Sequence, residues 1–144
     1  MLIREAGRDD AAQISALIQR SIVELCRDDH LDDAATLAGW LSNKAPANVE
    51  AWIAAPGSQL FVARRHEALV GVAGLTGAGD LTLLYVAPQA RFSRVSDDLL
   101  VHVEGRARTL GLPRLRLTTT FTARRFFLER GYTMMEEEGD IFAS

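Results

Sequence analysis

Two arginines, Arg91 and Arg94, lie in the segment that joins a predicted strand ending at Val86 to a predicted helix beginning near Ser93. The first amides of a helix have no hydrogen-bond partner within it and carry the positive end of the helix dipole. Together with two guanidinium groups they can hold an anion such as a pyrophosphate. The same residues also suit a plain connector with solvated arginines, and the pattern alone leaves both interpretations open.

A few other side chains have the chemistry to move a proton. Asp80 begins a predicted strand and could act as a base through water, although an aspartate after Gly77-Ala78-Gly79 also suits a turn. Tyr85 and Tyr132 are the only tyrosines, and each could donate a proton or simply pack as an aromatic. The single cysteine and the three scattered histidines predict neither a disulfide nor a metal site.

The elements that must position these residues follow from hydrophobic periodicity and turn signals. Asp10, with Gln13 three residues later, indicates a capped helix start, and Asp32-Asp33 and Pro46 indicate two more. The expected order is strand 2–6, two or three helices, strands 60–65, 69–76 and 81–86, helix 93–110, strand 115–118, a helix ending at 130 and an extended stretch 132–142. This order predicts an α/β fold with one central sheet, in which strands 81–86 and 115–118 are parallel neighbours or nearly so.

Charge is distributed unevenly along the chain. The formal net charge is −3, yet residues 91–130 hold nine basic and four acidic side chains. This basic block allows an anionic ligand, but Asp97, Asp98 and Glu104 interrupt it and no nucleic-acid motif accompanies it. No apolar stretch approaches the roughly 20 residues that span a bilayer, and the N-terminus lacks a signal peptide's apolar run. We therefore expect a cytoplasmic protein with no membrane or nucleic-acid partner.

Two segments resemble the GNAT N-acetyltransferase family. Tyr85-Val86-Ala87-Pro88 with Arg91, Val95 and Leu99-Leu100 is similar to the family's strand and pyrophosphate loop, and residues 119–132 are similar to its Ala-x-x-Phe-Tyr-x-x-x-Gly-Phe/Tyr segment. The resemblance covers nearly the whole chain. It implies a single GNAT-like domain over residues 1–144, with a mixed twisted sheet of about six or seven strands flanked by about four helices.

The resemblance also implies a reaction, in which an acetyl group passes from acetyl-CoA to an amine of a small molecule or peptide by direct attack. Asp80 and Tyr132 are the catalytic candidates, and backbone N–H groups near Leu84 to Val86 would polarise the thioester. A homodimer is common among similar proteins, and no metal is implied. The expected acetyl-CoA-binding residues are Leu84, Tyr85, Val86, Arg91, Phe92, Ser93, Arg94, Val95, Ser96, Thr119 and Phe126.

Two departures from the family pattern keep a second hypothesis open. Arg94 and Ser96 stand where the family's loop has small residues, with glycine at the position of Arg94, and Phe127 stands where many members have a tyrosine that protonates the departing thiolate. A phenylalanine has no proton to give, and an arginine hinders the close approach of backbone to phosphate that glycine permits. The alternative is therefore a catalytically impaired GNAT-fold binding or regulatory module.

Overall fold

The computed structural model describes residues 1–25, 31–91, 93–118, 121–134 and 140–143. One short 3-10 turn, η1, precedes α1, and a second, η2, follows β4. The elements are β1 (Leu2–Glu5), η1 (Arg8–Asp10), α1 (Ala11–Leu25), α3 (Ala34–Leu41), α4 (Pro46–Ala54), β2 (Ser58–Arg65), β3 (Ala68–Thr76), β4 (Leu81–Val86), η2 (Pro88–Ala90), α5 (Val95–Thr109), β5 (Arg116–Thr118), α6 (Phe121–Leu128), β6 (Tyr132–Met134) and β7 (Asp140–Ala143). The predicted α/β class is confirmed.

The strands form two sheets. Strands β1 to β4 make an antiparallel sheet in chain order, and β5, β7 and β6 make a second antiparallel sheet in that spatial order. The predicted single mixed sheet is wrong in this respect. In the described residues the parallel link between the two sheets is one bridge, Asp80 to Arg116, so β4 and β5 are neighbours only where they begin.

The C-terminal stretch also differs from its prediction. One extended run over 132–142 was expected, but β6 pairs antiparallel with β7, with Tyr132 opposite Ala143 and Met134 opposite Ile141. The chain therefore reverses between these two strands. Strand β7 lies between β5 and β6 in the second sheet. Hydrophobic periodicity does not predict this arrangement.

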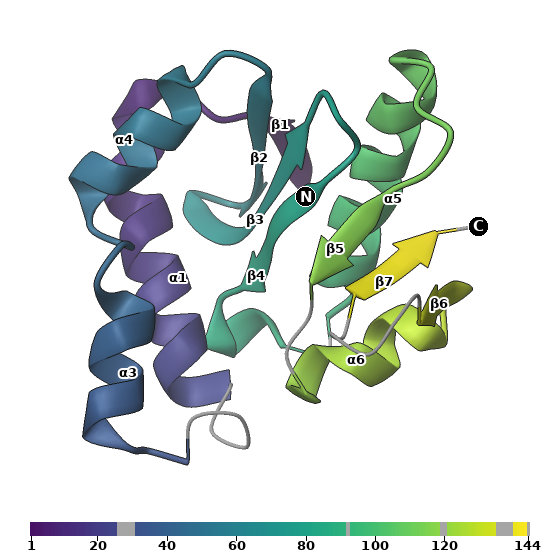
Figure 1. Cartoon of the computed structure of the whole chain (residues 1–144). Coiled ribbons are helices and arrows are strands. Elements are labelled where there is room, and N and C mark those ends of the chain that lie inside the picture. Colours follow the sequence, from purple (N-terminus) through teal and green to yellow (C-terminus); the bar gives the residue numbers. More distant parts are fainter. Residues whose placement is uncertain (26–30, 92, 119–120, 135–139, 144) are drawn as a thin grey trace.

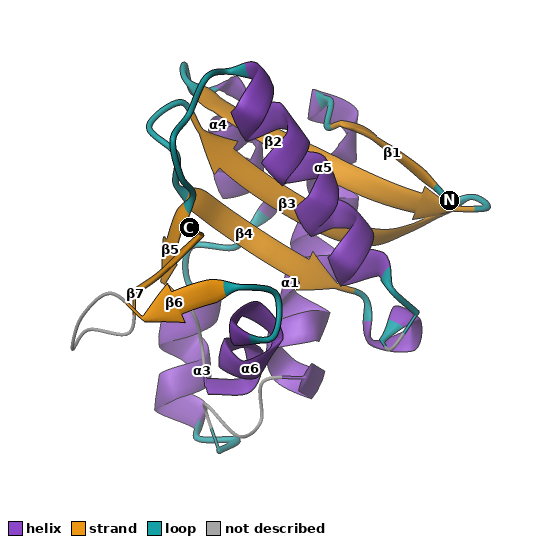
Figure 2. Ribbon diagram, turned by 90° about the vertical axis from the view of Figure 1, so that its right-hand side faces the viewer, coloured by secondary structure: helices purple, strands orange, loops and turns teal. Residues whose placement is uncertain are grey.

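Helices cover both faces of the four-stranded sheet. Figures 1 and 2 show α1 and α4 against one face and α5 against the other, with α6 beneath the second sheet. The core between these layers contains the fully buried Ile14 and Ile18 of α1, Val72 of β3 and Leu99 of α5. The helical spacing of apolar residues in α1 and α5 predicts this packing correctly.

Gly71 in β3 lets α5 approach the sheet closely. A Cβ at this position would lie 2.6 Å from Leu99 Cδ1 and 2.8 Å from Val95 Cγ1, both closer than van der Waals contact. Since Val95 is the first residue of α5, the absence of a side chain at Gly71 determines how tightly the start of that helix packs on the sheet.

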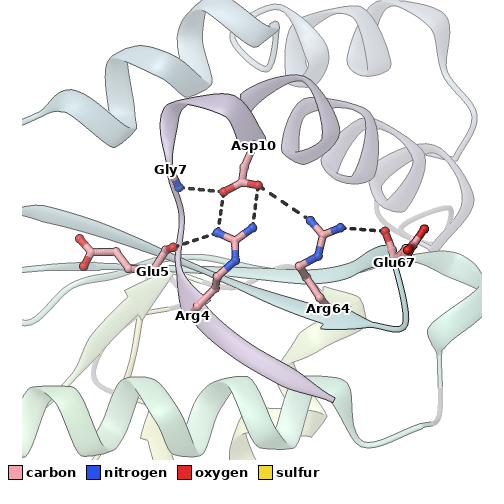
Figure 3. A network of polar contacts seen from close by, with 6 residues as sticks. All are labelled: Arg4, Glu5, Gly7, Asp10, Arg64 and Glu67. Atoms are coloured by element: carbon pink, nitrogen blue, oxygen red, sulfur yellow. Dashed lines mark hydrogen bonds and ion pairs between the residues drawn. The ribbon is translucent and has the colours of Figure 1, made fainter.

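An ion-pair network joins β1 to the segment before α1 (Figure 3). Both guanidinium nitrogens of Arg4 donate to the Asp10 carboxylate, at 2.8 and 3.0 Å, and the Gly7 N–H donates to it at 2.8 Å. Arg64 of β2 lies 4.0 Å away. Asp10 was expected to start a capping box with Gln13, but it is the third residue of the η1 turn and satisfies the Gly7 amide instead.

Candidate active site

The loop between β4 and α5 is tied to the sheet at several points. The Ala87 N–H donates to the Val70 carbonyl at 2.9 Å, and the Ser93 hydroxyl donates to the Ala90 carbonyl. From the end of β2, an Arg65 guanidinium nitrogen donates to the Ser93 carbonyl at 3.5 Å. Because carbonyl and N–H point in opposite directions across a trans peptide, this contact turns the Arg94 N–H away from Arg65.

Arg94 occupies the left-handed region, with φ 66° and ψ 13°, and is the N-cap residue of α5. Its side chain makes no capping hydrogen bond, and the helix's first hydrogen bond runs from the Asp98 N–H to the Arg94 carbonyl at 3.0 Å. The amides of residues 95–97 precede that bond. The loop thus keeps a backbone conformation that favours glycine, although the residue there is an arginine. Holding a non-glycine residue in this conformation costs roughly 1–2 kcal/mol.

The predicted acetyl-CoA residues fall into one contiguous group and one separate residue. Leu84, Tyr85 and Val86 pair with β3 at the end of β4, opposite Ala73, Val72 and Gly71. Arg91, Ser93, Arg94, Val95 and Ser96 follow along the loop and the first turn of α5, with Arg91 and Arg94 exposed and Val95 buried. Phe126 comes from α6, and Phe92 and Thr119 lie outside the described residues.

Strand β4 has an irregularity near its beginning. The pairing with β3 shifts between Gly74 and Leu75, which leaves Thr82 as the extra residue on β4. A Cβ at Gly74 would meet Thr82 Oγ1 at 2.4 Å, so the bulge requires a glycine opposite it. The segment from Leu84 to Val86 keeps regular register with β3, and in the described residues its other edge forms no ladder with β5.

Asp80 lies at the opposite end of β4 from the loop. Its Oδ1 accepts from Arg116 Nε at 2.7 Å, and its backbone N–H donates to the Thr76 hydroxyl at 3.0 Å. Six strand residues separate it from Ala87, which is roughly 20 Å of extended chain. Asp80 therefore precedes β4, whereas the loop that contains Arg94 follows the other end of that strand.

Tyr132 is buried and its proton is engaged. Its hydroxyl donates to Glu104 of α5 at 2.9 Å, and its ring packs 5.4 Å from that of Phe127. Burial, followed by the hydrogen bond and charge of Glu104, raises the pKa of Tyr132 well above its usual range. Phe127 is itself buried and meets Phe126 edge-on at 5.2 Å. The Tyr132 ring is thus a neighbour of the position where many relatives have tyrosine.

Sequence reasoning missed an ion pair between α5 and the residues that follow α6. Arg130 donates through Nε and Nη2 to the two carboxylate oxygens of Asp97, with Nη2 to Oδ2 at 3.0 Å. Hydrogen bonding from Arg130 holds the pKa of Asp97 below its usual value. Arg65 was missed as well. Arg65 belongs to no motif and Arg130 occupies a variable position of the segment 119–132, and the partners are 28 and 33 positions apart, so no local spacing signals the contacts.

Neither a cluster of His, Cys, Asp and Glu side chains with the makings of a metal site nor a helix long and apolar enough to cross a membrane occurs in the part of the chain that the structure describes.

A layered α/β fold with a turn leading into a helix N-terminus at the end of a strand is typical of proteins that bind an anionic ligand there. Residues 26–140 match the acetyltransferase (GNAT) domain family, and the chain belongs to that family. Members of this family use acetyl-CoA.

Relatives and solved structures agree with this membership. An amino-acid acetyltransferase of Azotobacter vinelandii is 38% identical over 79 residues, covering 51% of this chain and 18% of that protein, and one of Ralstonia nicotianae is 45% identical over 56 residues, covering 39% and 12%. The chain thus spans less than a fifth of the length of these curated relatives.

Two solved structures share the fold along almost the whole chain. A GCN5-related N-acetyltransferase of Rhodopseudomonas palustris has a TM-score of 0.89 at 24% identity and covers 99% of this chain and 94% of its own. The PaiA N-acetyltransferase of Thermoplasma acidophilum, in complex with coenzyme A, has a TM-score of 0.81 at 14% identity and covers 98% and 95%. The left-handed turn at Arg94, the amides of residues 95–97 and the two exposed arginines are a donor set that fits the pyrophosphate of CoA.

Proposed function

We propose that this protein transfers an acetyl group from acetyl-CoA to an amine of a small molecule or peptide by direct attack, and that residues 1–144 act as one acetyltransferase domain. The observation that carries the proposal is the left-handed Arg94 turn, which opens the first turn of α5 at the end of β4. Amides there and the guanidinium groups of Arg91 and Arg94 hold the pyrophosphate, and Leu84 to Val86 and Phe126 line the path of the thioester arm.

The reaction requires a neutral amine and a stable leaving group. The amine nitrogen attacks the thioester carbon, the C–S bond breaks, and the electron pair leaves with sulfur as thiolate. Backbone N–H groups on the unladdered edge of β4 near Leu84 to Val86 polarise the carbonyl. A thiol pKa near ~8.5 makes the thiolate a tolerable leaving group, so a weak acid suffices.

Two side chains have proton-transfer roles in this proposal. Asp80 receives the amine proton through a chain of waters along β4, with Arg116 holding its carboxylate in place at 2.7 Å. Tyr132, the buried phenol beside Phe127, supplies a proton to the thiolate, and Glu104 orients its hydroxyl. Burial and the hydrogen bond to Glu104 raise the pKa of Tyr132 and make it a reluctant donor, so we expect Asp80 to contribute more to turnover.

The acceptor class follows from the relatives. The two partial relatives are named amino-acid acetyltransferases, so free amino acids are the first acceptors to test, followed by polyamines and peptide N-termini. We further propose a cytoplasmic enzyme that pairs with a second copy through β6 and β7, which light scattering would test.

Calorimetry with acetyl-CoA and a free-thiol assay over that amine panel test the proposal. We expect saturable binding by the wild type and, for Arg91→Ala, an affinity several-fold lower because one charge-assisted phosphate contact is lost. Absence of heat and of thermal stabilisation at millimolar acetyl-CoA would overturn the assignment.

One observation favours the second candidate, a binding or regulatory module without turnover. Phe127 is buried between the rings of Phe126 and Tyr132 and places no hydroxyl there. If this candidate is right, acetyl-CoA binds but no amine in the panel releases free thiol above the uncatalysed rate. The two candidates therefore share the binding experiment and separate on the thiol assay.

A further inference from the structure

The end of α6 is joined to the first turn of α5 by one side chain, Arg130. Two of its nitrogens hold the two carboxylate oxygens of Asp97, and Nη1 donates to the Phe126 carbonyl at 2.8 Å. Asp97 is the third residue of α5, and Phe126 lies in the last turn of α6. The guanidinium thus bonds simultaneously to side-chain and backbone groups of two helices that are remote in sequence.

The same guanidinium also lies over the Phe126 ring. Its carbon atom is 3.7 Å from the ring centroid, which is cation–π distance. The other neighbour of that ring is Phe127, edge-on at 5.2 Å. Phe126 is therefore held between a guanidinium and a buried ring, so its position depends directly on Arg130.

This contact differs from an ordinary surface ion pair. The Arg130 and Asp97 side chains are 30% and 26% exposed, whereas Arg125 and Glu129, which pair at 2.8 Å on the outside of the same helix region, are 89% and 55% exposed. Exposed pairs of the second kind contribute about 0–1 kcal/mol and constrain little. The Arg130 contact is bidentate and partly buried, so it constrains geometry.

Asp97 also places a negative charge in the helix turn that faces the proposed pyrophosphate. Hydrogen bonding from Arg130 and, to a smaller extent, the charge of Arg94 lower the pKa of this carboxylate. A carboxylate left without Arg130 would be released toward the loop, where it would repel a diphosphate and compete with it for Arg94.

We infer that Arg130 is a positioning residue for acetyl-CoA, which it serves by holding Phe126 and the end of α6 against the first turn of α5 and by keeping Asp97 directed away from the phosphate loop. The inference rests on the proposed function, since it presumes that acetyl-CoA binds at this turn. It assigns to Arg130 no contact with the ligand, because three of its N–H groups are already committed to Asp97 and Phe126.

The test compares Arg130→Ala, Arg130→Lys and Asp97→Asn with Arg125→Ala as the matched control. Calorimetry gives the Kd for acetyl-CoA, and the thiol assay gives KM and kcat where turnover is found. Arg130→Ala should raise the Kd about tenfold, the size expected when one charge-assisted contact is lost. Arg130→Lys should raise it about threefold, because lysine keeps the charge but not the fork. Arg125→Ala should leave it within about twofold, and kcat at saturating acetyl-CoA should change little in all four variants.

Each remaining result has a clear meaning. Arg130→Ala with a lower melting temperature but the wild-type Kd would make the contact merely structural and overturn the inference. If Arg130→Ala fails to fold, Arg130→Lys decides, and an unchanged Kd there overturns the inference. Asp97→Asn loses the contact but also the repelling negative charge, so its Kd should lie between those of the wild type and Arg130→Ala. A raised Kd for Arg125→Ala equal to that of Arg130→Ala would also overturn it. Failure of the wild type to bind acetyl-CoA would instead refute the proposed function, and the inference with it.

Discussion

Among the described residues, Asp10 and Asp97 each receive a bidentate contact from one arginine, and they lie in different regions of the sequence. Asp10 accepts from Arg4 and from the Gly7 amide, with Arg64 nearby (Figure 3), and only 9% of its side chain is exposed. Asp97 accepts from two nitrogens of Arg130, and 26% of its side chain is exposed. In both aspartates the pKa lies below its usual value, and the hydrogen bond from arginine is the largest cause.

The difference between the two lies in what each joins. The Asp10 network links β1, the turn before α1 and β2, which are parts of the fold remote from the phosphate loop in sequence. The pair of Asp97 and Arg130 joins the end of α6 to the first turn of α5. The proposed anion site of the phosphate loop lies at that first turn. Similar chemistry therefore serves stability near the N-terminus and, in our proposal, ligand affinity at the start of α5. Variants that shift stability and acetyl-CoA affinity separately can test this distinction.

The largest effect on stability is expected from Asp10→Asn. An amide cannot accept both Arg4 donors and the Gly7 N–H as a carboxylate does, so a nearly buried charge-assisted network is broken. We expect the free energy of unfolding at pH 7 to fall by about 3 kcal/mol, measured by urea denaturation. The Kd for acetyl-CoA should stay at its wild-type value, and a change above about threefold would contradict the proposed division between the two regions.

The contribution of Asp10 to the free energy of unfolding should depend on pH. The Asp10 pKa is lowered in the folded state, so its stabilisation is present above the unfolded-state pKa and is lost as pH falls through the folded-state value. The stability difference between wild type and Asp10→Asn should be constant from about pH 5 to 8 and shrink below about pH 4. A difference that persisted at lower pH would show that the carboxylate charge is not its source.

Gly71→Ala should affect both quantities. The added methyl would press on Leu99 and Val95 at the start of α5, and overpacking of this kind costs about 2 kcal/mol. Because Val95 follows Arg94 directly, we also expect weaker acetyl-CoA binding. Gly105→Ala is the matched control within α5: nothing lies within 4 Å of its Cβ position, so it should stabilise the helix. Thermal unfolding and calorimetry on both variants check this, and a silent Gly71→Ala would be contrary to the packing described.

The sequence predicts the elements well and the contacts between them poorly. Helix starts at Asp33, which caps α3 by accepting from the Thr36 N–H, and at Pro46, the first residue of α4, depend on neighbours a few residues away and were identified correctly. The loop from Arg91 to Ser96 was located by its resemblance to a family motif. The division into two sheets, the reversal between β6 and β7, and the contacts of Arg130 and Arg65 depend on residues far apart in the chain, where local propensity and periodicity carry no signal.

The smallest stability effect, and the sharpest test of the loop, comes from comparing Arg94→Gly with Arg94→Ala. Arg94 has φ 66° and is exposed, so glycine removes strain that alanine keeps, while both remove the guanidinium. We expect Arg94→Gly to be more stable than Arg94→Ala by about 1 kcal/mol and both to bind acetyl-CoA several-fold more weakly than wild type. Arg94→Lys, which keeps a charge, should lie between them and wild type in affinity.

If Arg94→Gly binds acetyl-CoA more tightly than wild type, the arginine obstructs the phosphate loop instead of contributing to it, and the role proposed for its guanidinium is wrong. That outcome would leave the contacts of Arg130 with Asp97 and Phe126 in place, so the positioning role inferred for Arg130 would still be decided by the Arg130 variants themselves.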